Sequence, residues 1–410
     1  MMLQHGVPSL PFLKYQLPIM ENLKIFLILH EEIGLKENLI NGIKTPTKRM
    51  SRSIYIKAPA RICLFGDHQD YLGLPVIACS IGRFINLKAA TNKHQKLHIK
   101  LPNINSERII EVSENFENLE KGDHFAAALR VVRRHGVYID SGYDIQISGD
   151  IPINAGVSSS SALVVVWVHF LLKAFGTKKQ LQPEFIAQLA YEAEVLEHSS
   201  PGGKMDQYTI GIGHVIFLKT GADFKYEIIG KTLDGLVLGE SGIGKDTLGV
   251  LGNIKGNALK AIDFVKKIDT FFNLEKATLK DFETHQNSLP DDLVPYFYAA
   301  IQNHVITQKA LIELKKTTLN YSLIGDLMSQ HHQVLKNNLK ITIPRIDAMI
   351  DAALNAGAYG AKIIGSGGGG CIVALAPVHL QIKISQAIKN AGAKDAYSVK
   401  VTSGTKIFNE

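Results

Sequence analysis

Short runs of apolar and alternating residues dominate the first half of the chain after residue 52. Apolar residues at every second position are typical of half-buried β-strands, and Gly, Pro or Asp residues bound these runs. Helical spacing of apolar positions predicts a helix over residues 124–136. The predicted strands of this half cover residues 53–58, 61–65, 76–81, 84–90, 143–148 and 214–220.

The second half is mainly helical in pattern, with polar residues between apolar positions at helical spacing. The change from strand-rich to helix-rich sequence falls near residues 233–244, which predicts a domain boundary there. Strands return over residues 361–366, 371–377 and 398–401. Together with an earlier helix over residues 182–198, the predicted helices cover residues 251–276, 279–286, 293–316, 324–335, 344–356 and 381–391.

These patterns predict an α+β fold. At 410 residues the chain is longer than one ordinary core, so two domains are expected, over residues 51–235 and 236–410. Residues 1–50 are predicted to form an extension and linker, because prolines interrupt the opening and a polar segment follows one amphipathic helix at 20–33.

A serine-rich loop followed by a long apolar run, residues 149–176, is the stretch around which the other motifs are arranged. Serine hydroxyls at positions 158–161 can satisfy free amides in a first helical turn, and Gly156 tolerates positive φ. A helix start combines N–H donors with the positive end of the dipole, so it favours a phosphate. Serine oxygens also suit Mg²⁺, which prefers oxygen ligands.

Composition narrows the class of protein. With 46% hydrophobic and 20% charged residues, the chain is typical of soluble globular proteins. The net charge of +7 suits anionic ligands, but no dense basic run with aromatic residues indicates nucleic-acid binding. The apolar run at 162–172 is too short for a membrane span, and no secretory signal is recognisable. Three cysteines without metal-ligand spacing predict free thiols and a cytoplasmic location.

Acidic and imidazole side chains gather after one short apolar strand. Residues 58–71 read APARICLFGDHQDY, which places Asp67, His68 and Asp70 at the end of that strand. Closely spaced acceptors of this kind suit a polyol, because each hydroxyl needs a hydrogen-bond partner.

Two further segments carry candidate chemistry, and a third resembles a motif without meeting its requirements. Residues 201–207 place Asp206 behind a glycine pair, where its carboxylate could deprotonate a hydroxyl. Residues 357–375 hold four consecutive glycines between strand-like runs, which predicts a close backbone approach. Residues 239–246 have the glycine and lysine spacing of a P-loop, but Asp246 stands where a P-loop has Ser or Thr, so no P-loop is expected.

In this order, the segments resemble the motifs of the GHMP small-molecule kinases, most closely the galactokinases within that family. The resemblance rests on APARICLFGDHQDY, PINAGVSSSSAL, GGKMDQ and GAYGAKIIGSGGGGC, and it covers about residues 53–375. It implies a β-rich N-terminal ATP-binding domain and a ferredoxin-like α+β C-terminal domain, with the active site between them. It also implies transfer of the γ-phosphoryl group of ATP, with Mg²⁺, to the anomeric hydroxyl of galactose or a similar sugar. A monomer or weak homodimer is expected.

The resemblance also implies residue roles. Asp206 corresponds to the catalytic base, and Arg61 to the arginine that stabilises the transferring group or assists that base. Ser160 and Glu194 correspond to the Mg²⁺ contacts. The implied substrate-binding residues are Asp67, His68, Asp70 and Gly203, and the implied nucleotide-binding residues are Gly156, Ser158, Ser159, Ser160, Gly365, Gly367 and Gly368.

Departures from the galactokinase pattern concern the sugar. Ala60, Cys63 and Asp67 stand where galactokinases usually have Gly, Asn and Glu, and Lys204 replaces an apolar residue. A shorter acid and an added lysine suit a sugar that carries a carboxylate. A mevalonate-type or uronic-acid kinase therefore stays an alternative, although the acceptor cluster argues against mevalonate. A non-catalytic sugar sensor is the second alternative, and the intact aspartate and arginine argue against it.

Overall fold

The computed structural model describes residues 53–230, 232–244 and 247–408. The predicted extension over residues 1–50, including its helix, lies outside these ranges, as do residues 245 and 246 of the P-loop-like segment. The boundary predicted at residue 235 also stays a prediction, since the described residues pack as one unit.

The larger sheet contains long antiparallel strands at its centre. Its strand order is β12-β1-β2-β5-β3-β4, with β6 paired to β2 and β7 to β6. The strands predicted at 53–58 and 61–65 form one strand, β1, in which a register shift after Pro59 accommodates a residue without an N–H donor. The bounds are β1 Ser53–Phe65, β2 Val76–Thr91, β3 Lys96–Leu101, β4 Ser106–Glu111, β5 Tyr143–Gly149, β6 Val215–Lys219, β7 Lys225–Ile228 and β12 Lys406–Phe408.

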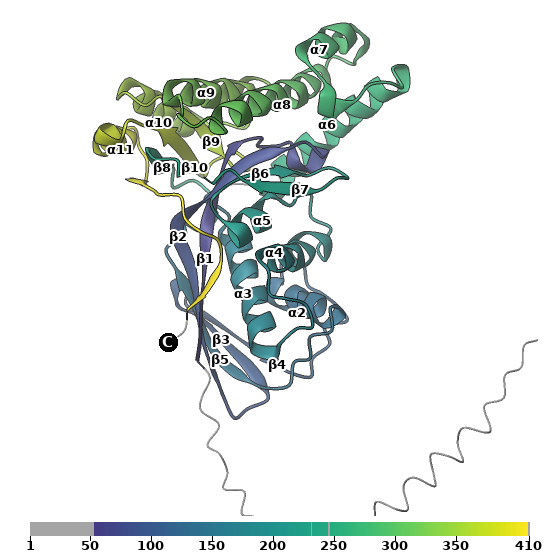
Figure 1. Cartoon of the computed structure of the whole chain (residues 1–410), viewed down its shortest axis with the longest axis vertical. Coiled ribbons are helices and arrows are strands. Elements are labelled where there is room, and N and C mark those ends of the chain that lie inside the picture. Colours follow the sequence, from purple (N-terminus) through teal and green to yellow (C-terminus); the bar gives the residue numbers. More distant parts are fainter. Residues whose placement is uncertain (1–52, 231, 245–246, 409–410) are drawn as a thin grey trace, which may run out of the picture. The chain divides into compact units, whose positions relative to one another are not determined.

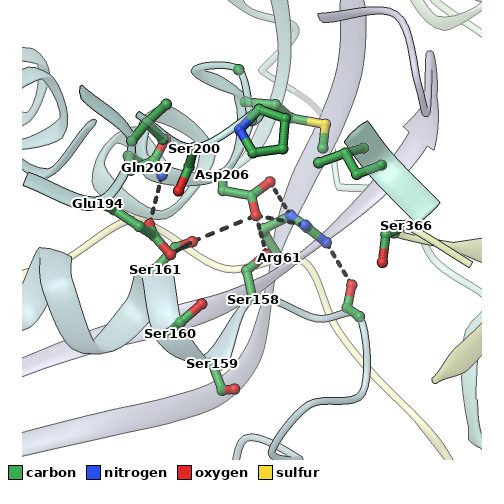
Figure 2. Close-up of a pocket in the computed structure, with 18 of the residues that line it drawn as sticks. Arg61, Ser158, Ser159, Ser160, Ser161, Glu194, Ser200, Asp206, Gln207 and Ser366 are labelled. Atoms are coloured by element: carbon green, nitrogen blue, oxygen red, sulfur yellow. Dashed lines mark hydrogen bonds and ion pairs between the residues drawn. The ribbon is translucent and has the colours of Figure 1, made fainter. Parts of the chain in front are cut away.

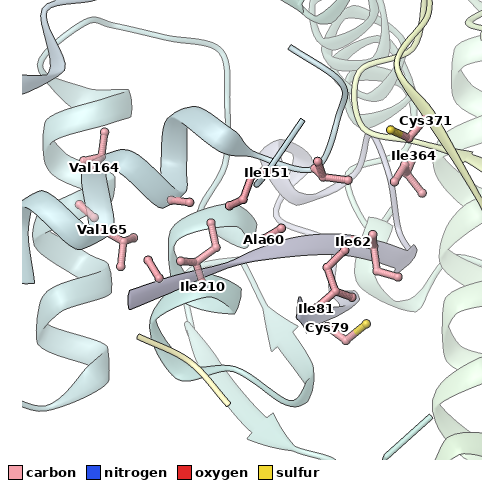
Figure 3. Close-up of a cluster of buried hydrophobic side chains, with 14 of the residues drawn as sticks. Ala60, Ile62, Cys79, Ile81, Ile151, Val164, Val165, Ile210, Ile364 and Cys371 are labelled. Atoms are coloured by element: carbon pink, nitrogen blue, oxygen red, sulfur yellow. The ribbon is translucent and has the colours of Figure 1, made fainter. Parts of the chain in front are cut away.

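Helices cover one face of this sheet (Figure 1). The central one, α3, is apolar on nearly all sides and is buried between β1, β2 and its neighbouring helices. Its Val165 belongs to the same core as Ile210 and Ala60 (Figure 3). The helices are α2 His124–Arg134, α3 Ser159–Phe175, α4 Pro183–Tyr191 and α5 Met205–Ile212.

The helix predicted over residues 182–198 changes its hydrogen-bond pattern part-way. The α-helix ends at Tyr191, and a π-helical turn, Glu192–Leu196, follows it. Such turns occur frequently at functional sites. Hydrophobic spacing alone does not distinguish this turn from an α-helix.

The smaller sheet has the order β11-β8-β10-β9 and antiparallel pairing throughout. Helices α9, α10 and α11 contact it, while α6, α7 and α8 extend beyond it (Figure 1). The strand predicted at 398–401 is wrong, because pairing with β8 begins earlier and ends at Ser398. The bounds are β8 Leu236–Glu240, β9 Gly360–Ile364, β10 Cys371–Leu375, β11 Asp395–Ser398, α6 Thr247–Ile268, α7 Leu279–His285, α8 Val294–Leu314, α9 Tyr321–Asn337, α10 Pro344–Asn355 and α11 Gln381–Asn390.

Two simpler expectations can be compared with the structure. The three cysteines are buried and free, as predicted. Within the described ranges, no helix is long and apolar enough to cross a membrane.

Candidate active site

A cavity of about 470 Å³ brings together most of the predicted site residues. It lies where the end of β1, the serine loop before α3, the start of α5 and the glycine loop between β9 and β10 meet. The predicted site residues that line it are Arg61, Asp67, His68, Asp70, Gly156, Ser158, Ser159, Ser160, Glu194, Gly203, Asp206 and Gly365.

At the centre of the site, Asp206 and Arg61 form a bidentate ion pair (Figure 2). The Arg61 Nε and Nη2 atoms each lie 2.7 Å from a carboxylate oxygen of Asp206. Arg61 is only 3% exposed, and its third donor, Nη1, binds the Gly156 carbonyl oxygen at 2.7 Å. Two parallel charge-assisted bonds fix the orientation of both groups, so the Asp206 carboxylate is held in place before any ligand arrives.

Ser158 directly precedes α3, and its side chain is used differently from what the sequence predicted. Its backbone is left-handed, with φ of 60°, and its hydroxyl donates to Asp206 instead of capping the helix. The prediction that this serine satisfies first-turn amides is therefore wrong, because a carboxylate distant in sequence competes for the hydroxyl. The helix start keeps free N–H donors, which still favour a phosphate.

Glu194 projects from the π-helical turn toward the same cluster (Figure 2). Its carboxylate accepts hydrogen bonds from the Ser161 hydroxyl at 2.9 Å and from Gln207 Nε2 at 2.6 Å. Burial, and then the charge of Asp206, raise the pKa of Glu194. The sequence predicted only amide capping for Ser161 and no role for Gln207, although SSSSAL and MDQ contain them.

Asp70 occupies a different electrostatic setting. Burial and the charge of Asp206 raise the pKa of this carboxyl to about 6, against 3.8 ordinarily. A Cβ on Gly203 would lie 2.1 Å from Asp70 Oδ2, so only glycine leaves room for the carboxylate there. Gly203 thus shapes the pocket around an acidic acceptor.

His68 is also buried at this end of the cavity. It has a left-handed backbone, with φ of 63°, and its Nδ1 lies 3.0 Å from the Tyr71 hydroxyl. Burial lowers the pKa of His68 to about 4, so the imidazole is neutral at neutral pH. A neutral imidazole donates one hydrogen bond and accepts another, and its tautomer decides which nitrogen does which.

The glycine loop contacts the serine loop directly. A Cβ on Gly156 would lie 2.8 Å from the Ile364 carbonyl oxygen, and both Gly156 and Gly365 have positive φ. Gly367 and Gly368 do not line the described cavity, since Gly367 packs on Ile341 and Gly368 N–H donates to its carbonyl oxygen at 2.8 Å. The direct nucleotide contacts implied for these two glycines are not supported by this placement.

Lys204 lies outside the group of described residues that line the cavity. Its ammonium lies 4.5 Å from the centroid of the Phe224 ring and 5.3 Å from that of Tyr191. Burial lowers the pKa of Lys204. The idea that this lysine binds a substrate carboxylate therefore finds no support in its placement.

The residues present fit ATP and Mg²⁺. Hydroxyl and carboxylate oxygens of Ser160 and Glu194 line the cavity beside the start of α3, and Mg²⁺ prefers such oxygen ligands. A bound cation would stabilise the ionised form of Glu194, whose pKa is raised by burial. The N-terminus of the long helix α3 suits phosphate oxygens.

Comparison with known families agrees with the order of the motifs. Residues 123–214 match the GHMP kinase N-terminal domain, and residues 309–394 match the GHMP kinase C-terminal domain. This chain thus contains both GHMP kinase domains. Members of this family are phosphotransferases that use ATP, and the predicted α+β GHMP kinase fold is confirmed.

Relatives of this chain include kinases with different phosphoryl acceptors. A galactokinase of Clostridium perfringens is 28% identical over 382 residues, covering 88% of this chain and 94% of the relative. A mevalonate kinase of Thermococcus sibiricus is 25% identical over 347 residues, covering 83% of this chain and 93% of the relative. These identities do not assign an acceptor.

Solved structures show the same fold. Lactococcus lactis galactokinase complexed with galactose superposes with a TM-score of 0.76 at 20% identity, covering 87% of this chain and 95% of that one. Mevalonate kinase of Methanococcus jannaschii superposes with a TM-score of 0.64 at 18% identity, covering 86% of this chain and 99% of that one.

Proposed function

We propose that this GHMP kinase is a sugar kinase that phosphorylates the anomeric hydroxyl of galactose or a galactose-configured sugar. The observation that carries this proposal is the pairing, in one cavity, of the Arg61-bound Asp206 with the acceptor groups Asp70 and His68. Sugar hydroxyls would form hydrogen bonds with Asp70 and His68. This binding would bring one further hydroxyl of the sugar to the Asp206 carboxylate. The enzyme is expected to act in the cytoplasm as a monomer or weak homodimer.

In this mechanism Asp206 takes the proton of the attacking hydroxyl. The oxygen–phosphorus bond forms at the γ-phosphorus as the bond to the bridging oxygen breaks, and ADP leaves. Arg61 keeps the Asp206 carboxylate in place through two hydrogen bonds of 2.7 Å. Positioning and charge neutralisation supply most of the catalysis in phosphoryl transfer.

The nucleotide would be held by the serine loop. We assign Gly156, Ser158, Ser159 and Gly365 to its phosphates, with Mg²⁺ held by Ser160 and Glu194. Mg²⁺ would neutralise phosphate charge during transfer. The predicted roles of Gly367 and Gly368 become indirect, through support of the loop that contains Gly365.

A neutral acceptor suits this cavity better than an anionic one. Among the described residues that line it, the basic side chains with a fixed charge are Arg61 and Lys121. Arg61 is committed to Asp206 and the Gly156 carbonyl oxygen. A carboxylate placed near Asp70 would face another acid, which argues against mevalonate and against a uronic acid.

The test is an acceptor panel with Mg·ATP. Galactose, related hexoses and pentoses, uronic acids and mevalonate would be compared by kcat/KM for ADP release. We expect a galactose-configured neutral sugar to exceed mevalonate by at least about 100-fold, because a site built for hydroxyls rejects ligands that leave its polar groups unpaired. Turnover of mevalonate without turnover of any sugar would overturn the assignment. Nucleotide binding without turnover of any acceptor would favour a sensor.

A further inference from the structure

Asp67 borders the cavity, but its carboxylate is bound by the protein on both oxygens. Its Oδ2 lies 2.6 Å from Lys362 Nζ, and its Oδ1 accepts a hydrogen bond from the Gly365 N–H at 3.0 Å. Asp67 is only 2% exposed. We propose that Asp67 and Lys362 are positioning residues that hold the glycine loop against the serine loop, and that Asp67 is not a ligand of sugar hydroxyls.

Lys362 joins the two sheets at this point. It lies on β9 of the smaller sheet, is 0% exposed, and donates to the Cys63 carbonyl oxygen at 3.2 Å, near the end of β1 in the larger sheet. Its third bond is to the Ile363 carbonyl oxygen at 2.8 Å, so all three ammonium protons have acceptors. An ammonium group buried this deeply requires a carboxylate partner, which Asp67 supplies.

The charge of Asp67 is matched locally by this lysine. Burial alone would raise the pKa of Asp67, but Lys362, His331 and the Gly365 N–H together outweigh that effect, and the pKa is lowered. The nearby imidazoles of His68 and His331 have pKa values lowered by burial to about 4 and about 3, so both are neutral at neutral pH. The ionised pair therefore consists of Asp67 and Lys362.

A direct chain of contacts connects this pair to the catalytic groups. A Cβ on Gly365 would lie 3.1 Å from the Gly156 Cα, and the Gly156 carbonyl oxygen accepts from Arg61. Arg61 in turn holds Asp206. Loss of the Asp67 contact would release Gly365 and thereby loosen the serine loop at its contact with Arg61.

The test separates positioning from sugar binding by measuring two ligands on three variants. Asp67→Asn, Lys362→Met and the double variant would be compared for the Kd of Mg·AMPPNP and for the acceptor KM. Each single variant is expected to weaken AMPPNP binding about 10-fold or more, because one buried charge loses its partner and the loop shifts. The double variant is expected to recover nucleotide binding to within about 3-fold of wild type, since no unpaired charge remains and the amide oxygen introduced by Asp67→Asn can still accept from the Gly365 N–H. Acceptor KM should change by less than about 3-fold in any folded variant, because Asp67 does not contact the acceptor.

The exposed pair Lys389–Asp395, 2.8 Å apart on the smaller-sheet side, provides a matched control. Lys389→Met with Asp395→Asn should leave both ligand measurements unchanged. A 10-fold rise in acceptor KM in Asp67→Asn or in the double variant, with AMPPNP binding unchanged, would overturn the proposal; about 10-fold is the scale expected for a lost sugar contact. The double variant decides the matter if the single variants do not fold. Only the measurement of the acceptor KM rests on the proposed function, since AMPPNP binding is measured without any acceptor.

Discussion

Asp206 and Asp70 line the same cavity in opposite electrostatic settings. Asp206 shares two hydrogen bonds with Arg61 and one with Ser158, so its charge is compensated within the protein. Asp70 accepts from the Tyr71 N–H at 2.9 Å, lies against Gly203, and has a pKa raised to about 6. The comparison indicates that the catalytic end is preorganised, whereas the acceptor end carries an acid that a substrate hydroxyl would stabilise.

The largest effect should come from Asp206→Asn. An amide keeps the shape but cannot take the proton, so kcat should fall by about 100-fold to 10,000-fold. The Kd of Mg·AMPPNP should change little, since the base does not bind the nucleotide in this mechanism. Steady-state kinetics and titration calorimetry would measure both quantities, with the exposed Asp263→Asn on α6 as control. Turnover within a few-fold of wild type would remove Asp206 from the mechanism.

A smaller and more selective effect is expected from Asp70→Asn. If Asp70 accepts a sugar hydroxyl, kcat/KM for the sugar should fall by about 10-fold or more while nucleotide affinity is retained. Kinetics at saturating ATP with varied sugar would measure this. An equal loss in nucleotide affinity would contradict the division of the cavity into two ends.

The same substitution should stabilise the fold at neutral pH. The pKa of Asp70 is raised from 3.8 to about 6 on folding, so the folded state holds this proton more tightly than the unfolded state. That contribution to stability is present below pH 3.8 and is lost as the pH rises through about 6. Asp70→Asn should therefore increase the free energy of unfolding at pH 7.5 by an amount on the order of 1 kcal/mol or more. Tm at this pH should rise by a few degrees.

The sign of this effect can be checked by calorimetry at two pH values. The gain in Tm should be smaller at pH 5.0 than at pH 7.5, because the wild-type carboxyl is then mostly protonated. A Tm that falls at both pH values would show that Asp70 is already compensated in the free protein, as Asp206 is.

The smallest effect is expected from Lys204→Met. The ammonium packs over the rings of Phe224 and Tyr191 and lies outside the described cavity lining, so kcat/KM for a neutral sugar should stay within about 2-fold of wild type. The exposed Lys260→Met on α6 is the matched control. A selective loss of activity toward a uronic acid would extend the acceptor end to Lys204.

The chemistry of the site was more predictable than its internal contacts. DHQDY, the serine run and MDQ place polar groups at the ends of apolar segments, and the structure gathers them around one cavity. Lys362 escaped notice because a lysine within a short strand usually points to solvent, whereas here its partner lies 295 positions earlier. The hydroxyl of Ser158 likewise donates to Asp206, and the local rules for helix caps do not predict a partner so far away in the sequence. Local propensity identifies such groups, and long-range pairing decides their use.

The position of β12 in the larger sheet affects whether fragments of the protein can be expressed in soluble form. β12 pairs with β1, the strand that carries Arg61, and Val401 and Ser403 bridge to Ile81 and Gly213. The larger sheet is thus completed by a strand that follows the whole smaller sheet in the sequence. A fragment that stops near residue 235 would leave one edge of β1 unpaired, and such edges promote aggregation. Expression of the two halves together should therefore yield more soluble protein than expression of the first half alone.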